Sequence, residues 1–224
     1  MLEMLVDFKE LRMMYTCAIK EVKTKFEVLD TEFKVRYRRN PISDIESRLK
    51  SNQSILEKME RRHIPFSLEN VEKNINDIAG IRVICSYIDD IYLLADALSA
   101  QDDIKILEVK DYIKNPKPNG YRSYHMIVSV PVFFAENRRN MKVEVQIRTI
   151  AMDFWASLEH QMKYKKEIPD QGEISARLQH CANGIAAIDQ EMLALREKIE
   201  AAEDKPTEED ILVEKLMKID VPLY

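Results

Sequence analysis

Hydrophobic residues in the first part of the chain recur every three, four or seven positions, as on one face of a helix. The recurring positions are Phe8, Leu11, Tyr15, Ala18, Val22, Leu29 and Phe33. Asp7 and Arg12 lie within this stretch, so the pattern predicts an amphipathic helix and not a signal peptide. Asn40 and Pro41 end it.

A second helix is predicted over residues 43–62, because Ser43 and Glu46 have the spacing of a capping box at a helix start. Pro65 ends this pattern. Ser67 is then expected to cap a short helix over residues 68–76.

The middle of the chain favours strands, because its apolar runs are rich in β-branched and aromatic residues. Four strands are predicted, over residues 81–88, 104–113, 123–134 and 142–148, with a helix over 91–100. Strands and helices interleave without strict alternation. The sequence therefore predicts an α/β (α+β) fold with a mixed sheet and flanking helices.

The C-terminal third predicts a long helix and a short final one. One apolar stripe of the long helix has heptad spacing, at Ile174, Leu178, Cys181, Ile185, Ile188, Met192, Leu195 and Ile199. Such a stripe either packs on the N-terminal helix or forms an oligomer contact.

Composition excludes several classes of protein. The formal net charge is −5, from Lys+Arg 34 and Asp+Glu 39, so DNA binding through bulk positive charge is not expected. Apolar runs are too short for a membrane span. Cys17, Cys85 and Cys181 are scattered and form no CxxC pair, which argues against a disulfide framework or structural zinc and favours a cytoplasmic protein.

Alternation along residues 142–148 separates an apolar face from a polar one. Val143, Val145 and Ile147 point one way, and Glu144, Gln146 and Arg148 point the other. If the strand holding His125 lies beside it, a carboxylate, an amide and an imidazole converge near Tyr121. Such a surface suits a polar ring and proton transfer, although a solvated polar face has the same pattern.

Two further features point to phosphate chemistry. Lys50, Ser54, Lys58 and Arg61 are spaced to share one helical face, which could bind a polyphosphate or simply face water. Asp77 precedes a predicted strand and could hold Mg²⁺ together with substrate phosphates, or serve only as a turn residue.

Five motifs occur in one order along the chain. They are Ser47-Arg-Leu-Lys50, Asp77-Ile-Ala-Gly-Ile-Arg82, Asn119-Gly-Tyr-Arg-Ser-Tyr-His125, Glu144-Val-Gln-Ile-Arg148 and Phe154-Trp-Ala-Ser-Leu-Glu-His160. Together they resemble the synthetase domain of the RelA/SpoT family, and the chain length resembles its single-domain branch, the small alarmone synthetases. The resemblance covers roughly residues 20–200.

The resemblance implies a nucleotidyltransferase-like synthetase fold with a sheet of about five strands. It also implies transfer of the pyrophosphate of ATP to the ribose 3′-hydroxyl of GDP or GTP, giving AMP and ppGpp or pppGpp in the stringent response. No His-Asp pair is present, so no hydrolase activity is expected. The expected division is an N-terminal helical segment (1–40), a synthetase core (41–166) and C-terminal helices (167–224).

By the same resemblance, the ATP site is expected to include residues that hold adenine and residues near the phosphates. Arg48 and Arg82 match the arginines that sandwich adenine. The residues matching positions near the phosphates are Lys50, Ser54, Lys58 and Arg61. Asp77 matches the Mg²⁺ ligand, and Glu144 matches the acid that activates the 3′-hydroxyl and assists the metal.

The resemblance places the acceptor nucleotide on other residues. Tyr121 matches a tyrosine stacked on guanine, Lys117 and His125 match residues at its phosphates, and Gln146 matches a position near the nucleoside. Asp153 replaces an Asn of some relatives, which would change the donor and acceptor pattern beside guanine.

Partners follow from the resemblance as well. Relatives form homotetramers through terminal helices, so a homo-oligomer is expected. Product-regulated relatives have a cleft near residues 40–47, where Asp44 adds a negative charge here. An allosteric nucleotide or a single-stranded RNA stays open as a regulator, and the alternative function is a catalytically silent nucleotide or single-stranded RNA binding module.

Overall fold

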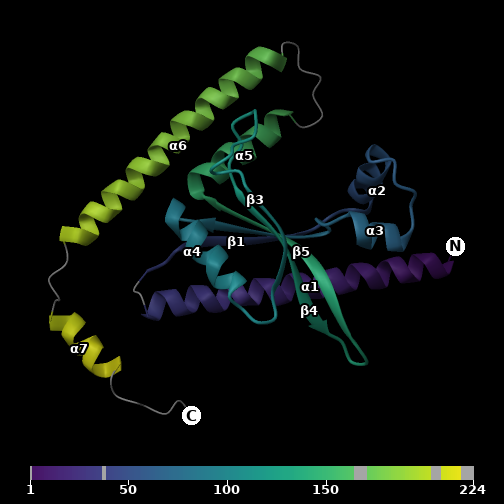
Figure 1. Cartoon of the computed structure of the whole chain (residues 1–224), viewed down its shortest axis with the longest axis horizontal. Helices are drawn as coiled ribbons and strands as arrows, with labels where there is room; N and C mark the ends of the chain where they lie inside the picture. The colour runs from purple at the N-terminus through teal and green to yellow at the C-terminus, as the bar shows by residue number, and fades with distance from the viewer. Residues whose placement is uncertain (1, 37–38, 164–170, 203–207, 218–224) are drawn as a thin grey trace.

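The computed structural model describes residues 2–36, 39–163, 171–202 and 208–217 (Figure 1). The elements within these ranges are α1 (Leu2–Arg36), β1 (Ile42–Leu49), α2 (Asn52–Arg61), α3 (Leu68–Asn74), β2 (Ala79–Cys85), α4 (Ile88–Ser99), β3 (Lys105–Asp111), β4 (Tyr124–Phe133), β5 (Arg138–Thr149), α5 (Ile150–Lys163), α6 (Gln171–Ala202) and α7 (Glu208–Met217).

The strands form one sheet in the order β1-β2-β5-β4-β3. β2 and β5 pair in parallel, while the β1–β2, β5–β4 and β4–β3 pairs are antiparallel. The sheet is therefore mixed, and the predicted α+β class is confirmed. The parallel pair requires a long crossover, which contains α4 and the antiparallel β3–β4 pair.

Helix α1 crosses one face of the sheet and buries the apolar stripe that its sequence predicts (Figure 1). Val22 and Phe26 are completely buried, and Leu11, Tyr15 and Phe33 are nearly so. These side chains pack with apolar residues of strands β1, β2, β4 and β5. One apolar face of the sheet is thereby covered, and its polar face is left for other uses.

The predicted helix over residues 43–62 is wrong in its first half. Ser43 and Glu46 lie on β1, and α2 begins only at Asn52, where the Ser51 hydroxyl accepts a hydrogen bond from the Ser54 backbone N–H. β1 is an edge strand whose side chains are mostly exposed, so its sequence is polar like that of a surface helix. Its backbone pairing with β2, which is distant in the sequence, decides the structure.

The other predicted elements are confirmed with shifted ends. Ser67 caps α3 as expected, and Ile88, predicted to end a strand, is instead the first residue of α4. The division into residues 1–40, 41–166 and 167–224 stays a prediction, and its second boundary lies outside the described residues.

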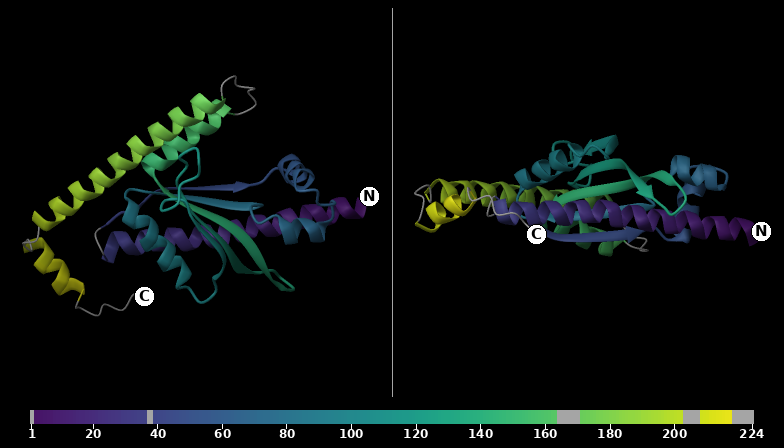
Figure 2. Two further views of the ribbon diagram at one scale, coloured as in Figure 1. Left: turned by 45° about the horizontal axis from the view of Figure 1, so that its top comes forward. Right: turned by 90° about the horizontal axis from the view of Figure 1, so that it is seen from below.

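The long helix α6 packs mainly on α5 and α4 and extends away from the sheet (Figure 2). Leu178, Ala182 and Asp189 are buried on its inner face. Much of the predicted heptad stripe lies on another face, where Ile188 is 61% exposed and Ile199 is 59% exposed. The stripe therefore does not pack on α1, which was one of its two predicted roles.

Across the described ranges, none of the helices combines the length and the apolar character that crossing a membrane would need.

The packing of α1 yields a stability prediction. Phe26→Ala should lower the free energy of unfolding by about 3–5 kcal/mol, because a fully buried ring leaves a cavity beneath the sheet. Urea denaturation monitored by circular dichroism measures the loss. Val28→Ala, at a side chain 59% exposed on the same helix, is the control and should change stability by less than about 0.5 kcal/mol. Equal losses in the two variants would contradict this packing.

Candidate active site

A single row of paired residues crosses the polar face of the sheet. Glu46 on β1 is opposite Arg82 on β2, Arg82 is opposite Gln146 on β5, and Gln146 is opposite His125 on β4. Residues that pair directly point to the same face. Four segments of the chain thus contribute polar side chains to one line, as the sequence predicted for β4 and β5.

A second row lies two residues away along β1 and β5, on the same face. Arg48 on β1 is opposite Gly80 on β2, and Gly80 is opposite Glu144 on β5. Because Gly80 has no side chain, nothing from β2 stands between Arg48 and Glu144 in this row. The intervening residues, such as Ile81 and Val145, point to the opposite face and are buried with α1.

Asp77 lies just before β2 and faces two lysines from the β1–α2 region. Lys50 Nζ is 2.9 Å from its Oδ2 atom, and Lys58 Nζ is 2.8 Å from its Oδ1 atom. Burial alone would raise the pKa of Asp77, but its contacts with the positively charged Lys58 and Lys50 outweigh that effect and hold this pKa below its ordinary value. Asp77 is therefore an ionised carboxylate with a positive surrounding.

The segment before Asp77 is fixed from β5. Lys142 Nζ donates to the backbone oxygens of Glu72 and Lys73 and to Oδ1 of Asn76, at 2.9, 3.1 and 3.0 Å. An ammonium group has three donors, and all three are used here. Lys142 precedes Glu144 by two residues on the same strand, so β5 sets the position of both acids.

Glu144 is mostly buried between neighbours on β5 and β4. Gln146 Nε2 donates to its Oε2 atom at 2.9 Å, and His125 Nδ1 is 3.7 Å from its Oε1 atom. Burial would raise the pKa of Glu144, but these two neighbours outweigh that effect and the pKa is lowered. Burial also lowers the pKa of His125, against the pull of Glu144. A carboxylate and a neutral imidazole result near neutral pH.

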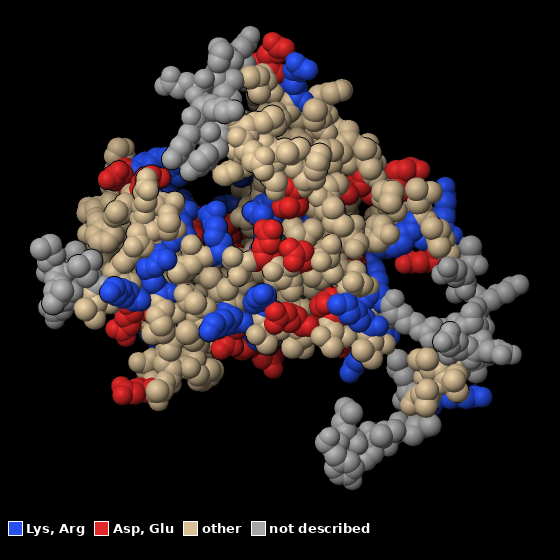
Figure 3. Space-filling model, turned by 180° about the vertical axis from the view of Figure 1, so that it is seen from behind, with Lys and Arg blue, Asp and Glu red and all other residues tan. Residues whose placement is uncertain are grey.

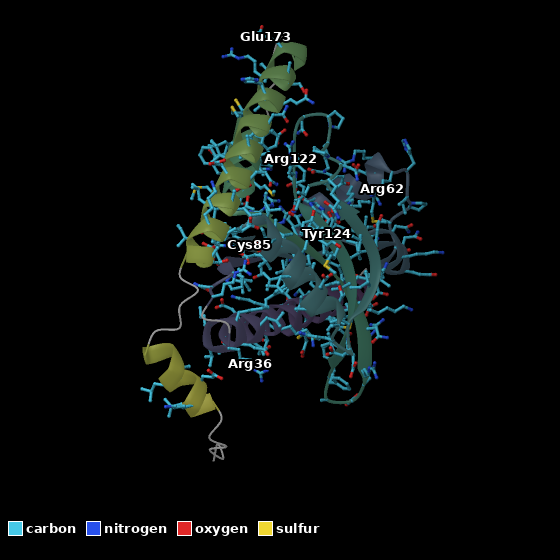
Figure 4. The ribbon with its side chains drawn as sticks, turned by 60° about the vertical axis from the view of Figure 1, so that its left-hand side comes forward. Arg36, Arg62, Cys85, Arg122, Tyr124 and Glu173 are labelled. Atoms are coloured by element: carbon cyan, nitrogen blue, oxygen red, sulfur yellow. The ribbon has the colours of Figure 1, made fainter. Side chains whose placement is uncertain are left out.

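Tyr121 is held by a turn that packs directly on α6. Gly120 has a φ of 88°, and a Cβ atom there would come within 2.5 Å of the Ala182 Cβ atom. Arg122 lies beside α6 (Figure 4), where it donates to the Ala182 backbone oxygen at 3.3 Å and to Oδ1 of Asn183 at 3.2 Å. Glycine at position 120 allows both the left-handed backbone and this close approach.

The ring of Tyr121 is surrounded by cations. Lys117 Nζ lies 4.6 Å from the ring centroid, and the guanidinium carbon of Arg148 lies 5.5 Å from it. The hydroxyl is within 2.9 Å of His125 Nε2. Burial raises the pKa of Tyr121, so the phenol stays protonated and available as a donor.

Two cavities open on this face and share one wall. The first, of about 550 Å³, is lined by Glu46, Ser47, Arg48, Asp77, Gly80, Ile81, Arg82, Glu144 and Gln146. The second, of about 600 Å³, is lined by Arg48, Asp77, Arg82, Lys117, Asn119, Tyr121, His125, Glu144, Gln146, Arg148, Ala156, Ser157, Glu159, His160 and Gln161. The shared residues are Arg48, Asp77, Arg82, Glu144 and Gln146.

Charged side chains of both signs line this region. In Figure 3, Lys and Arg side chains gather beside the hollow between the α2–α3 end of the molecule and α5, with acidic side chains close by. Such a mixed surface can neutralise phosphates and still keep a base ionised. The site therefore has room for two polar ligands that meet at Asp77 and Glu144.

Most of the residues predicted from the sequence come together here, but five do not line the cavities. Lys50 and Lys58 contact the site through Asp77. The predicted helical face shared by Lys50 and Lys58 does not form, because Lys50 precedes α2. Ser54 bonds the Ser51 hydroxyl, and Arg61 is exposed at the end of α2. Asp153 also stands outside both linings, where it contacts Arg148 at 3.0 Å and Arg82 at 3.4 Å.

Two charged residues on the polar face of the sheet received no role in the site from the sequence. Arg148 belongs to the Glu144–Arg148 motif and to the polar face of its strand. Both features indicate a site residue, although the predicted site does not include Arg148. Glu46 was assigned to a helix cap, but it pairs with Arg82 at 2.8 Å. No local signal could have found that pair, because it depends on the β1–β2 register.

Comparison with known proteins agrees with this arrangement. Residues 47–169 match the family described as "Region found in RelA / SpoT proteins". GTP pyrophosphokinase YwaC of Bacillus subtilis (strain 168) is 40% identical over 196 residues, which are 87% of this chain and 92% of that protein.

Two solved structures of small alarmone synthetase 1 from Bacillus subtilis are also similar. The one bound to its product pppGpp has a TM-score of 0.77 and 35% identity, covering 87% of this chain and 98% of that one. The one bound to AMPCPP has a TM-score of 0.72 and 31% identity, with the same coverage. The matched region, the identity and the shared fold together show that this chain belongs to the RelA/SpoT family, in its branch of small alarmone synthetases.

Proposed function

We propose that this protein is a (p)ppGpp synthetase, which transfers the pyrophosphate of ATP to the ribose 3′-hydroxyl of GDP or GTP. The observation that carries the proposal is the pair of cavities that share Asp77 and Glu144. Two nucleotides in these cavities would bring a phosphate chain and a ribose together at the shared wall. Holding two reactants in this way supplies much of the catalysis in phosphoryl-type transfer.

ATP fits the cavity that runs along β1 and β2. Arg48 and Arg82 line it, and their planar guanidinium groups can stack on the two faces of adenine. In this structure Arg82 forms an ion pair with Glu46, and this ion pair must break for Arg82 to stack on adenine. Lys50 and Lys58, which neutralise Asp77, are placed to neutralise phosphates as well.

The acceptor GDP or GTP fits the cavity between β4 and α5. Tyr121 offers a ring for guanine to stack on, Lys117 offers a positive group to its phosphates, and His125 lines the same cavity beside them. Gln146 lies in the wall shared by both cavities, next to the acceptor ribose in this arrangement. Asp153 acts on guanine only indirectly, through Arg148, because its carboxylate is already paired there.

Glu144 is the base of the proposed reaction. The 3′-oxygen of the acceptor attacks the β-phosphorus of ATP, while its proton passes to Glu144. The bond from the β-phosphorus to the oxygen that bridges it to the α-phosphorus breaks, and AMP leaves with that oxygen. Lys50 and Lys58 neutralise the charge that develops on the phosphates.

The residues present fit a Mg²⁺ ion bound mainly by substrate. Asp77 Oδ1 is buried, and its contact with Lys58 lacks the geometry of a hydrogen bond, so it is available as a ligand. Among the described residues no cluster of three or more His, Cys, Asp or Glu side chains could hold a metal. Asp77 with Glu144 and two phosphates is the kind of site that Mg²⁺ uses. When bound, the ion would polarise the phosphates and stabilise their negative charge.

The relatives support nucleotides as the substrates. One similar structure holds the product pppGpp and another holds AMPCPP, a nucleotide with the shape of ATP. We also propose a cytoplasmic location, which is supported by three cysteines that are all free thiols.

A product assay tests the proposed activity. Purified protein receives ATP, Mg²⁺ and either GDP or GTP, and the nucleotides are separated by anion-exchange chromatography. AMP together with ppGpp or pppGpp is the expected result. Release of inorganic pyrophosphate would indicate nucleotidyl transfer, and nucleotide binding without any product would indicate a silent binding module; each would overturn the proposal.

Replacing the base gives a sharper prediction. Glu144→Gln should lower kcat at least about 100-fold, because the amide cannot accept the hydroxyl proton. ATP affinity, measured by calorimetry without an acceptor, should stay within about threefold, since ATP binds chiefly at other residues. Glu108→Gln, an exposed acid on β3, is the control and should leave both quantities unchanged. Normal turnover in Glu144→Gln would remove Glu144 from the mechanism.

We further propose that the protein is a homo-oligomer, with a tetramer favoured. The outer stripe of α6 supports this, since Ile188, Met192, Leu195 and Ile199 are all large apolar side chains that are at least 43% exposed. A stripe of this kind at heptad spacing is typical of a helix that packs on another helix.

Charge on this stripe should break the assembly. Ile188→Asp is expected to give a smaller species than the wild type in size-exclusion chromatography with light scattering, because a carboxylate would be buried in the contact. Gln190→Asp adds the same charge to an exposed position beside the stripe and should keep the wild-type mass. A monomeric wild type, or an unchanged mass for Ile188→Asp, would contradict the contact.

A further inference from the structure

Arg148 makes three hydrogen bonds at the centre of the site, although it is only 4% exposed. It donates to Oδ1 of Asp153 at 3.0 Å, to the Tyr121 hydroxyl at 3.0 Å and to Oε1 of Gln146 at 2.6 Å. A guanidinium has donors and no acceptor. Each atom that is hydrogen-bonded to Arg148 must therefore be an acceptor. This fixes the direction of the next hydrogen bond that the same side chain makes.

The first consequence concerns Gln146. Its amide oxygen must face Arg148, so its NH₂ group faces Glu144 and donates to Oε2 at 2.9 Å. The reversed amide would set NH₂ against the guanidinium and oxygen against the carboxylate, which is unfavourable at both ends. Arg148 thus fixes which end of Gln146 meets the catalytic carboxylate.

The second consequence concerns Tyr121 and His125. The phenol oxygen accepts from Arg148, and its one proton then points to His125 Nε2, which is 2.9 Å away. This proton has an acceptor on His125 only if Nε2 is unprotonated. A neutral imidazole with unprotonated Nε2 carries its proton on Nδ1, the nitrogen that faces Glu144 Oε1 at 3.7 Å.

The opposite tautomer of His125 is unfavourable at the Nδ1 side of the ring, which faces Glu144. With the proton on Nε2, the Nδ1 lone pair would face the Glu144 carboxylate, and the phenol proton would lose its acceptor on His125. Two facing acceptors in a mostly buried position repel each other. The polarity set by Arg148 and the charge of Glu144 therefore select the same tautomer.

We propose that Arg148 is a positioning residue that sets which polar group each neighbour turns toward Glu144, through Gln146 on one side and through Tyr121 and His125 on the other. Gln146 then donates a hydrogen bond to one carboxylate oxygen, and His125 turns its Nδ1–H, not a lone pair, toward the other, so the carboxylate is held in place and stays ionised as the base. Arg148 acts without touching the reacting atoms. The kinetic part of this inference rests on the proposed function, whereas the tautomer does not.

The tautomer of His125 is the decisive measurement. Protein labelled with ¹⁵N at its histidines is examined by long-range ¹H–¹⁵N NMR at pH 8, without nucleotides or metal, and the His125 signals are assigned from their loss in His125→Gln. The expected result is a protonated Nδ1 and an unprotonated Nε2 in the wild type. A protonated Nε2, with or without a proton on Nδ1, would overturn the proposal even if neither Arg148 variant folds and even if the enzyme has another activity.

Two substitutions test whether Arg148 is the cause. Arg148→Gln introduces a group that can both donate and accept, so the Nε2–H tautomer of His125 should gain population against the pull of Glu144, which remains in this variant. Arg148→Lys keeps a group that only donates and should retain the proton on Nδ1. The matched control is Arg138→Gln at the far end of β5, where the arginine contacts Phe133, and it should match the wild type. A folded Arg148→Gln protein that keeps a single Nδ1–H tautomer would overturn the role of Arg148.

Kinetics give a second readout. Arg148→Gln should lower kcat about 10- to 100-fold, which is less than removal of the base, with the KM for ATP within about threefold. Arg148→Lys should recover part of the loss, and Arg138→Gln should keep wild-type values. A loss in Arg148→Gln that appears in KM alone would identify Arg148 as a binding residue and contradict the positioning role.

Discussion

The parallel pairing of β2 with β5 is the constraint on which the site depends. These strands lie about 60 residues apart in the sequence, yet their register places Gly80 beside Glu144 and Arg82 beside Gln146. Side chains alternate between the faces of a sheet, so a slip of one residue would turn Glu144 toward α1 and bring Val145 to the polar face. The buried face, packed against Val22 and Phe26, makes such a slip unfavourable and thereby fixes the position of the base.

The polar face is kept stable by pairing nearly every charge with another group. Asp77 is balanced by Lys50 and Lys58, and Arg148 by Asp153. Such pairs lose hydration when they are half-buried, so they add little to the free energy of folding. Their value is in position, because each of them fixes a side chain that the proposed reaction needs in one place.

Helix α6 links this site to the outer surface of the molecule. Its inner face supports the acceptor side through Gly120 and Arg122, and the buried Asp189 accepts a hydrogen bond of 2.6 Å from Thr149, next to Arg148. Its outer face carries the exposed apolar stripe around Ile188. One rigid helix therefore contacts both the loop that holds Tyr121 and the surface where we propose another copy of the chain.

Elements with a local signal can be predicted from the sequence alone. The stripe of α1 repeats with the period of a helix, and Ser67 caps α3 by a contact three residues away. The alternation of Val143, Glu144, Val145 and Gln146 shows in advance which face of β5 is polar. The five sequence motifs also contain most of the residues that line the two cavities. Binding a nucleotide requires particular side-chain types, and these can be recognised in a sequence.

Features that depend on partners distant in the sequence become visible only in the folded chain. The stretch around Glu46 has the composition of a helix start and becomes a strand because β2 offers it backbone hydrogen bonds. The stripe of α6 has one spacing, but its burial depends on where α5 and α4 lie. The orientation of Gln146 and the tautomer of His125 follow from Arg148, and hydrogen-bond direction is a property of groups in contact, which no spacing along a chain contains.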